Sequence, residues 1–574
     1  MTRASLQRCL ALLACTPLLL AQEVSAADPA DVVLRNGKIY TVDATRSIRQ
    51  ALAFTGNTIV AVGTDAELAP LVGLETVVVD LQGRLVLPGL IDTHVHPVLG
   101  AVNAAKCSLA DVPAKIDALR PVLRDCLEAR PGGPDDWLEA VQLDNYGFSA
   151  TAAELDSVDA TRPIALYGND GHTLWTNGRG LMLAGITATT PDPEGGRIDR
   201  DASGQHTGFL ADAAMNLVLG QIPIPPVDLR ADYTAAELRS MAASGITSLA
   251  DVYVTPTEAE VWHLLHDSGR LTMRVRTSIY VEDLGDDSSE AVAAILAASK
   301  AMDVDPDFLR GGSVKFFADG VIEAPTQTAA LLEPYLDAEG RPTDSRGELY
   351  FEPEPFARLV TRLDAAGLNI HVHAIGDRAT RATLDAFAAT RAANGATDNR
   401  HQIAHLQLVD PADFPRFSEL DVLANMQLDW AKRDSSNEGP LEPYLGPERY
   451  RYLYPAGSLL AAGATIVGGS DWDVSTYHPF VAMQHAVTRV ERGMDRLPLN
   501  LDERVPLAVA IDAYTINAAL ALKQEATTGS LEVGKRADLV ILDRDILTVD
   551  PETIQDTVVL ATWLDGRLVH GAPP

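Results

Sequence analysis

Two histidines, separated by one residue, end an apolar run in the first fifth of the chain. The stretch reads "LPGLIDTHVHPV" over residues 87–98 and contains His94 and His96. If this run is a β-strand, alternate side chains share a face, so both imidazoles point the same way. That spacing lets one metal ion take a nitrogen from each ring. The pair alone is a weak signal, because many such histidines lie on surfaces or are hydrogen-bonded in a core.

Further residues of metal-ligating types recur at the ends of other apolar runs. A lysine in the apolar run "SVKFFADG" would lose hydration without an evident partner, unless its ammonium reaches solvent at the strand end. Barrel enzymes assemble their sites at the C-terminal ends of their strands, and each of these residues lies near such an end. The set therefore predicts a metal site. Its downstream members are Lys315, His371, His373, His405 and Asp471.

The segments between these residues alternate in character. Short β-branched runs are followed by Ala- and Leu-rich helical stretches such as 290–302 and 381–393. Strand and helix in repetition predict a parallel sheet with right-handed crossovers. With the run at 85–96 there are eight strands, enough for an α/β fold of the (β/α)₈ TIM-barrel type. The other seven are 245–254, 272–281, 313–320, 368–377, 401–409, 422–428 and 464–472.

The two ends of the chain hold additional strand-like runs. Residues 31–86 and 525–574 contain short strands joined by tight turns, and each segment is too small to fold alone. They predict a small β-sandwich domain formed by both chain ends. The barrel domain then covers residues 87–475, and residues 476–524 supply C-terminal barrel helices.

A Gly-, Pro- and Asp-rich stretch from about residue 130 to 235 reads as an insertion after the first barrel strand. Two runs within it, 137–143 and 162–168, also look like strands. One or both of these runs could instead belong to the barrel.

Residues 1–26 have the pattern of a secretory signal peptide. Two arginines precede an apolar run over residues 9–21, and small residues at 24–26 form an A-x-A-like cleavage site. We therefore expect a secreted protein of a bacterial periplasm. The alternative is a lipoprotein, because "LLAC" at residues 12–15 is similar to a lipobox. No later apolar run is long enough for a transmembrane helix, so we expect no membrane contact in the mature form.

Composition restricts the partners and the redox state. The net charge of −33 argues against nucleic acid or an anionic membrane as a partner. It favours solubility or, alternatively, an acidic docking surface. Removal of the signal leaves two cysteines, Cys107 and Cys126, which either form a disulfide in an oxidising compartment or stay buried and reduced.

The ordered set H-x-H, Lys, His, His, Asp on successive strands resembles the amidohydrolase superfamily. More narrowly, "LPGLIDTHVH", "VKFFADG", "HVHAIGDRA", "HQIAHLQ" and "GSDWDVS" are similar to its amidohydrolase-3 branch, which includes N-substituted formamide deformylases and YtcJ-like proteins. "NDGHTLWTN" and "GSLEVGKRADLVILD" resemble further parts of that branch. The resemblance extends from about residue 31 to the C-terminus.

This resemblance implies a site with two divalent metal ions. Histidine and carboxylate ligands suit Zn, Mn, Ni and Fe comparably, with zinc our expectation. A CO₂-derived carbamate on the lysine would bridge the two ions. The implied ligands are His94, His96 and Asp471 for the first ion, His373 and His405 for the second, and Lys315 between them.

Three positions near the implied ligands need separate comment. His373 precedes "AIGD" as the family ligand does, so His371 either supports the metal shell or packs. Asp473 replaces a proline that often follows "SDW", which can alter the loop beside the aspartate ligand. Ala404 replaces a frequent glutamate and leaves open which group orients His405.

The implied chemistry is hydrolysis of a C–N bond other than a peptide bond. Bound divalent ions lower the pKa of water toward about 7, and the resulting hydroxide attacks the carbonyl of an N-acyl or N-formyl amine. Asp471 can accept the proton and deliver it to the leaving nitrogen. His172 and Trp430 are candidates for binding this small-molecule substrate. The alternative for each is a plain loop or packing role.

Two other functions compete with this interpretation. One is a mononuclear deaminase or aminoacylase of the same superfamily, with Lys315 uncarboxylated. The other is a non-catalytic periplasmic binding protein, against which the complete ligand set argues. A homodimer is possible, because barrels of this size often dimerise. The sequence leaves open which amide, ester or lactam is cleaved.

Overall fold

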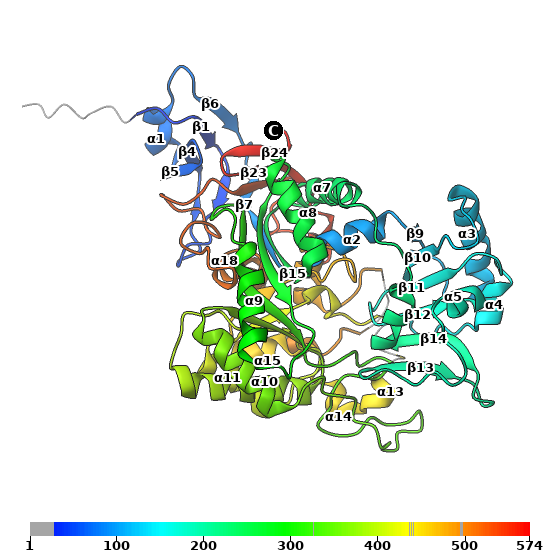
Figure 1. Cartoon of the computed structure of the whole chain (residues 1–574). Coiled ribbons are helices and arrows are strands. Elements are labelled where there is room, and N and C mark those ends of the chain that lie inside the picture. Colours follow the sequence, from blue (N-terminus) through cyan, green and yellow to red (C-terminus); the bar gives the residue numbers. More distant parts are fainter. Residues whose placement is uncertain (1–27, 325, 435–436, 438, 440, 494–496) are drawn as a thin grey trace, which may run out of the picture.

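The computed structural model describes residues 28–574, apart from 325, 435–436, 438, 440 and 494–496. The predicted signal peptide, residues 1–26, lies outside the described residues. A central barrel is flanked on one side by a β-sandwich built from both chain ends and on the other by a separate mixed sheet (Figure 1).

Eight parallel strands form the barrel in the order in which they occur along the chain, which confirms the predicted fold class. Each strand pairs with the next, and side chains alternate between the barrel interior and the surrounding helices. The strands are β8 (Leu90–Val95), β15 (Ile246–Val254), β16 (Arg274–Tyr280), β17 (Leu309–Phe317), β18 (Asn369–Ala374), β19 (Gln402–His405), β20 (Leu423–Met426) and β21 (Ile466–Gly468).

The barrel closes where its first and last strands meet. The Thr93 hydroxyl donates to the Gly468 carbonyl at 2.9 Å, and the Asp471 amide donates to the His94 carbonyl at 2.7 Å. Gly469 lies at this seam, where a Cβ atom would stand 2.5 Å from the His94 Cβ. Glycine is needed here because no side chain fits between the two strands.

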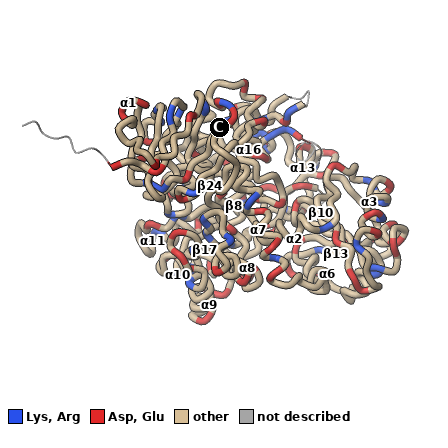
Figure 2. Tube along the Cα trace, turned by 90° about the horizontal axis from the view of Figure 1, so that it is seen from above, with Lys and Arg blue, Asp and Glu red and all other residues tan. Residues whose placement is uncertain are grey.

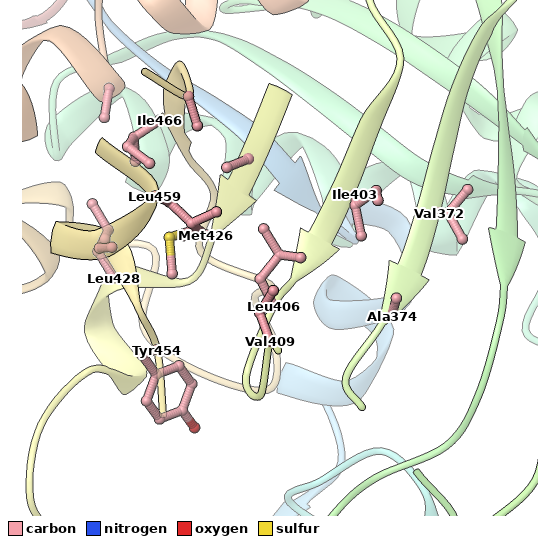
Figure 3. Packing of buried hydrophobic residues seen from close by; sticks show 14 of the residues in the cluster. Val372, Ala374, Ile403, Leu406, Val409, Met426, Leu428, Tyr454, Leu459 and Ile466 are labelled. Carbon is pink, nitrogen blue, oxygen red and sulfur yellow. The ribbon is translucent and has the colours of Figure 1, made fainter. Parts of the chain in front are cut away.

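Helices surround the barrel and cover the outward faces of its strands. On β18 the side chains of Val372 and Ala374 point outward into an apolar cluster that continues across β19, β20 and β21 (Figure 3). The intervening histidines of β18 therefore face the interior. None of the helices in the described part of the chain has the length and apolar character needed to cross a bilayer. The main helices of the barrel domain are α7 (Val227–Ala243), α8 (Pro256–Asp267), α9 (Ser289–Ala301), α10 (Pro353–Ala365), α11 (Asp377–Asn394), α12 (Phe414–Leu420), α15 (Ala456–Ala461), α16 (Pro479–Thr488), α17 (Leu507–Ala513) and α18 (Ile516–Ala521).

The two ambiguous strand-like runs belong to the separate sheet and not to the barrel. They form β10 and β11 in a six-stranded sheet of order β13-β14-β12-β11-β10-β9. This sheet begins at Cys107, upstream of the expected start of the insertion at about residue 130, and Cys107 is disulfide-bonded to Cys126 on α3. The elements are β9 (Cys107–Ser108), α3 (Ile116–Ala129), β10 (Leu138–Leu143), α4 (Ala152–Asp156), β11 (Ile164–Gly168), β12 (Thr173–Thr176), α5 (Gly178–Leu183), β13 (Gly196–Arg200) and β14 (His206–Asp212).

Both chain ends contribute to the β-sandwich. Its six-stranded sheet, β24-β23-β22-β7-β2-β3, pairs C-terminal with N-terminal strands, and a four-stranded sheet, β5-β4-β1-β6, packs on it through a shared apolar core. The buried Arg274 at the start of β16 joins the sandwich to the barrel through ion pairs with Asp538 and Asp565, both at 3.0 Å. The strands are β1 (Val32–Arg35), β2 (Lys38–Tyr40), β3 (Ile48–Arg49), β4 (Ala51–Thr55), β5 (Thr58–Gly63), β6 (Val77–Asp80), β7 (Leu85–Pro88), β22 (Leu539–Leu542), β23 (Val559–Leu564) and β24 (Arg567–Gly571).

Substitution Gly469→Ala tests the closing seam. The added methyl group must displace His94, so we expect a loss of about 1–3 kcal/mol of stability, a lower melting temperature and weaker binding of added divalent metal ions. Thermal unfolding and metal analysis measure both effects. Gly285→Ala is the matched control, because this exposed glycine has only an ordinary contact at 3.5 Å. Equal behaviour of the two variants would contradict the proposed role of the seam.

Candidate metal centre and substrate cavity

Three of the predicted ligands form a compact group at the C-terminal end of the barrel. Ligand atoms of His94, His96 and Asp471 all lie within 4.8 Å of one another. The Asp471 Oδ1 is 2.9 Å from the His96 Nε2 and 3.2 Å from the His94 Nε2. Two imidazoles and one carboxylate at this spacing suit a divalent transition metal.

The remaining predicted ligands lie directly beside this group. The rings of His373 and His405 have centroids 4.5 Å apart, and His405 lies 4.8 Å from the His94 ring. The Lys315 Nζ is 3.2 Å from the His94 Nε2. Side chains from five strand ends thus meet at one place.

The protonation of the group suits a metal. Burial lowers the pKa of His94 to about 3 and holds the pKa values of His373 and His405 well below the usual range. These imidazoles are therefore neutral, the form that binds metal. The buried His96 Nδ1 and His405 Nδ1 also have no hydrogen-bond partner among the described residues. The His405 Nδ1 lies 4.0 Å from the Asp471 Oδ2, and an unpartnered ring nitrogen beside a carboxylate suits the binding of a metal ion.

Asp471 is held as a carboxylate. Burial by itself raises the pKa of the Asp471 carboxyl, but the neighbouring His94 and His96 hold it well below its usual range. An ionised carboxylate can both ligate a metal ion and accept a proton from a nucleophile.

Two of the ligand residues have backbone conformations that non-glycine residues rarely adopt. The φ angle is 76° at His405 and 55° at Asp471. Each such residue costs on the order of 1–3 kcal/mol and persists where the surrounding structure over-determines it. Both residues end or follow a barrel strand, so the left-handed turn redirects the chain while the side chain points at the centre.

Sequence reasoning missed two buried aspartates that hold the ligand loops. Asp92 accepts hydrogen bonds from the amides of His94 and Ser470, at 3.1 and 3.0 Å, and so ties both sides of the seam. Asp319 accepts from the amides of Ala330, Ile375 and Gly376. A signal was present, because both are acidic residues inside apolar runs, "LIDTHVH" and "FFADG".

His371 supports the ligand group formed by His94, His96 and Asp471. Its Nε2 lies 3.0 Å from the Nδ1 of His94, on the opposite side of the ring from Asp471. Burial holds the pKa of His371 well below its usual value, so the ring is neutral and can accept a hydrogen bond. A partner on the second ring nitrogen fixes the tautomer and orientation of a ligating histidine.

The departures from the family pattern have local explanations. Asp473 accepts a hydrogen bond from the Asn103 amide group at 2.7 Å and so joins the ligand loop to helix α2 (Pro97–Ala104). The His405 ring stacks on Trp430, with centroids 5.4 Å apart and planes 5° from parallel. This stacking orients His405 although residue 404 is an alanine.

A cavity of about 990 Å³ lies beside the group and reaches it at Asp471. Its wall includes Asp471 and both predicted substrate-binding residues, His172 and Trp430. His172 comes from the insertion and pairs with Asp212 through its Nδ1 at 2.6 Å, and its ring lies 5.7 Å from that of His373. Barrel and insertion therefore enclose the cavity together.

Comparison with known sequences gives consistent similarities. The model of the amidohydrolase family matches residues 77–570. The chain is 30% identical to an N-substituted formamide deformylase of Arthrobacter pascens, over 94% of this chain and 98% of the relative. It is also 30% identical to the protein LONG AFTER FAR-RED 3 of Arabidopsis thaliana (94% and 92%) and 26% identical to the putative amidohydrolase YtcJ of Bacillus subtilis (86% and 91%).

Solved structures agree on the fold. An uncharacterised metal-dependent hydrolase of Pyrococcus horikoshii aligns with a TM-score of 0.71 at 23% identity, covering 91% of this chain and 99% of that one. A zinc complex of the atrazine chlorohydrolase TrzN of Arthrobacter aurescens aligns with a TM-score of 0.53 at 16% identity, covering 94% of each chain.

Substitution His371→Phe tests whether His371 supports His94 as a metal ligand. A flat aromatic ring is kept while the acceptor for the His94 N–H is lost, so we expect zinc affinity to fall 10–100-fold. Competition with a chromogenic chelator measures the affinity. His570→Gln, on strand β24 of the sandwich, is the control. Unchanged affinity in His371→Phe would mean that His371 only packs.

Proposed function

The chain belongs to the amidohydrolase family, and on that premise we propose that it hydrolyses the amide bond of an N-acyl or N-formyl amine with the help of two divalent metal ions. The observation that carries the proposal is the convergence of the ligand-type side chains beside a cavity large enough for a small-molecule amide, with Asp471 on the cavity wall. The similarity to a formamide deformylase supports a C–N bond as the target.

The metal ions would be held by two adjoining sets of side chains. We assign His94, His96 and Asp471 to one ion and His373 and His405 to the other. When bound, the ions supply an activated water and polarise the amide carbonyl. We propose zinc as the metal. TrzN, which shares the fold, has been solved as a zinc complex, and this supports the proposal.

Lys315 would join the two sets as a carbamate. Its side chain is fully buried, and no carboxylate in the described part of the chain forms an ion pair with it. Burial lowers the pKa of the Lys315 ammonium to about 7, so the free amine is accessible at neutral pH. The amine nitrogen can attack CO₂ and release a proton, and the product is an anionic oxygen ligand in place of a buried cation.

Asp471 would transfer the proton. The carboxylate is ionised and lies at the cavity wall, so it can take a proton from the attacking water and return it to the departing nitrogen. His172 and Trp430, on the same wall, would contact the substrate. In the mononuclear alternative Asp471 has the same role, but no carbamate on Lys315 is needed.

We also propose that the protein is exported. The disulfide between Cys107 and Cys126 supports an oxidising compartment, because cytosolic thiols are kept reduced. The sequence pattern of residues 1–26 points the same way.

Substitution Lys315→Ala tests the bridging role. We expect two zinc ions per wild-type chain and at most one in the variant, with partial recovery when acetate or propionate replaces the lost carboxylate. Metal analysis of the dialysed proteins provides the count. Lys300→Ala, exposed at the end of α9, is the control. One ion per chain in the wild type would favour the mononuclear alternative.

Substitution Asp471→Asn tests the function and the proton transfer together. Zinc-loaded wild type is assayed against a panel of N-formyl, N-acetyl and longer N-acyl amines. On any amide that is cleaved, we expect the variant to lose a factor of about 10²–10⁴ in kcat while keeping its circular dichroism spectrum. Asp502→Asn, on an exposed turn, should behave as the wild type. Near wild-type turnover in Asp471→Asn excludes this residue as the proton carrier, and a panel without any cleavage excludes the proposed substrate class.

A further inference from the structure

The cavity wall is more acidic than the rest of the protein. Acidic residues are spread over the described part of the chain (Figure 2), and the full sequence has 79 of them against 46 lysines and arginines. The described residues of the cavity wall include eight acidic residues besides Asp471, but one lysine and no arginine. The ratio of acidic to basic residues is therefore higher on this wall than in the whole chain. The eight are Asp111, Asp144, Asp170, Glu323, Asp429, Asp434, Asp473 and Glu491.

The basic groups on the described wall are already paired. The Lys432 Nζ lies 3.2 Å from the Asp429 carboxylate and 3.9 Å from that of Asp434. The His172 ring is paired with Asp212. Away from the proposed metal ions, a substrate carrying a carboxylate or phosphate would find no uncommitted cation on the described wall, and it would face the surrounding negative charge.

Two wall carboxylates, Asp170 and Glu323, are buried and form no ion pair with a described lysine, arginine or histidine, but Asp170 already accepts hydrogen bonds from Asn145, the His172 amide and Thr173. Glu323 follows strand β17 and is only 8% exposed. Its Oε1 accepts a hydrogen bond from the Gln407 side chain at 2.6 Å, and no described lysine, arginine or histidine forms an ion pair with it. Buried charges are normally paired. Burial accordingly raises the pKa of Glu323 to about 7, and a cation beside it would favour the ionised form.

Glu323 is also close in the chain to residues of the metal centre. Gly320, three residues earlier, accepts a hydrogen bond from the His373 Nε2 at 3.1 Å through its carbonyl. Gln407, its hydrogen-bond partner, follows His405 by two residues. The aromatic side chains of Tyr146, Trp430 and Tyr454 line the same cavity, and aromatic faces attract ammonium groups.

We propose that the amine part of the substrate carries a second, protonated amino group, and that Glu323 binds this group. This inference rests on the proposed function and narrows it to N-acylated or N-formylated diamines. Hydrolysis of such an amide consumes one water molecule, breaks the C–N bond and forms a C–O bond, and the proton goes to the departing nitrogen. The products are a diamine and a carboxylate.

Three amides of nearly equal size test the charge preference on the zinc-loaded enzyme. They are N-acetylbutane-1,4-diamine (cationic), N-acetylpentylamine (neutral) and 4-acetamidobutanoate (anionic). We expect kcat/KM for the cation to exceed that for the neutral amide at least tenfold, with the anion lowest. The ratio should fall as salt rises from 20 to 300 mM, because salt screens the attraction. Equal rates, or a preference for the neutral or anionic amide, would overturn the proposal.

A binding measurement separates failure of this inference from failure of the proposed function. If none of the amides is cleaved, the proposed function fails, but calorimetry with butane-1,4-diamine, pentylamine and 4-aminobutanoate still reports the preference of the cavity. Tighter binding of the diamine by at least tenfold supports recognition of the second ammonium. Equal affinities contradict it.

Substitution Glu323→Gln identifies the residue. The amide side chain keeps the volume and can still accept from Gln407, so we expect a correctly folded protein whose cation-to-neutral ratio falls at least tenfold. The control is Glu448→Gln, an exposed residue outside the cavity wall, which removes the same charge from the protein and should keep the ratio. An unchanged ratio in Glu323→Gln would refute the assignment. The salt series needs no variant and decides the charge preference even if this one misfolds.

Discussion

The site depends on the closing of the barrel between its first and last strands. The Asp471 amide bonds to the His94 carbonyl, and the Asp471 carboxylate lies against the imidazoles of His94 and His96. Asp92 holds both strands of this seam through two backbone amides. One seam therefore joins the two ends of the sheet and assembles the ligand group of His94, His96 and Asp471, so the fold and the chemistry cannot be separated there.

The rest of the centre is built by the strands between these two. Alternation along β18 places His373 and His371 inside the barrel, while their neighbours pack outward against the helices. His405 and Asp471 adopt left-handed backbone conformations that an isolated chain would rarely populate. The large apolar core around the barrel is what can stabilise such conformations, because it leaves the strand ends few alternatives.

The insertion forms part of the wall of the cavity beside the metal centre. Barrel loops supply Glu323 and Trp430, and the insertion supplies His172 and Asp170. The disulfide from Cys107 to Cys126 fastens the sheet of the insertion near its start. The barrel thus supplies the ligand-type side chains, while the insertion and the loops set the charge and shape of the cavity wall. In this protein that charge is negative.

The sequence by itself determined the barrel and the ligand-type residues, because strand periodicity and ligand spacing are local properties of the chain, and the resemblance of its motifs indicated the family. It could not place the runs at 137–143 and 162–168, which have barrel-like composition but pair in a separate sheet. It also left open whether His371 supports a ligand, whether the cysteines pair, and what orients His405. Only the tertiary structure decided these points, because each depends on a partner distant in the sequence: His94, Cys126 and Trp430. The charge of the cavity wall was also decided by the tertiary structure, since its carboxylates are scattered from residue 111 to residue 491 and come together only when the chain is folded.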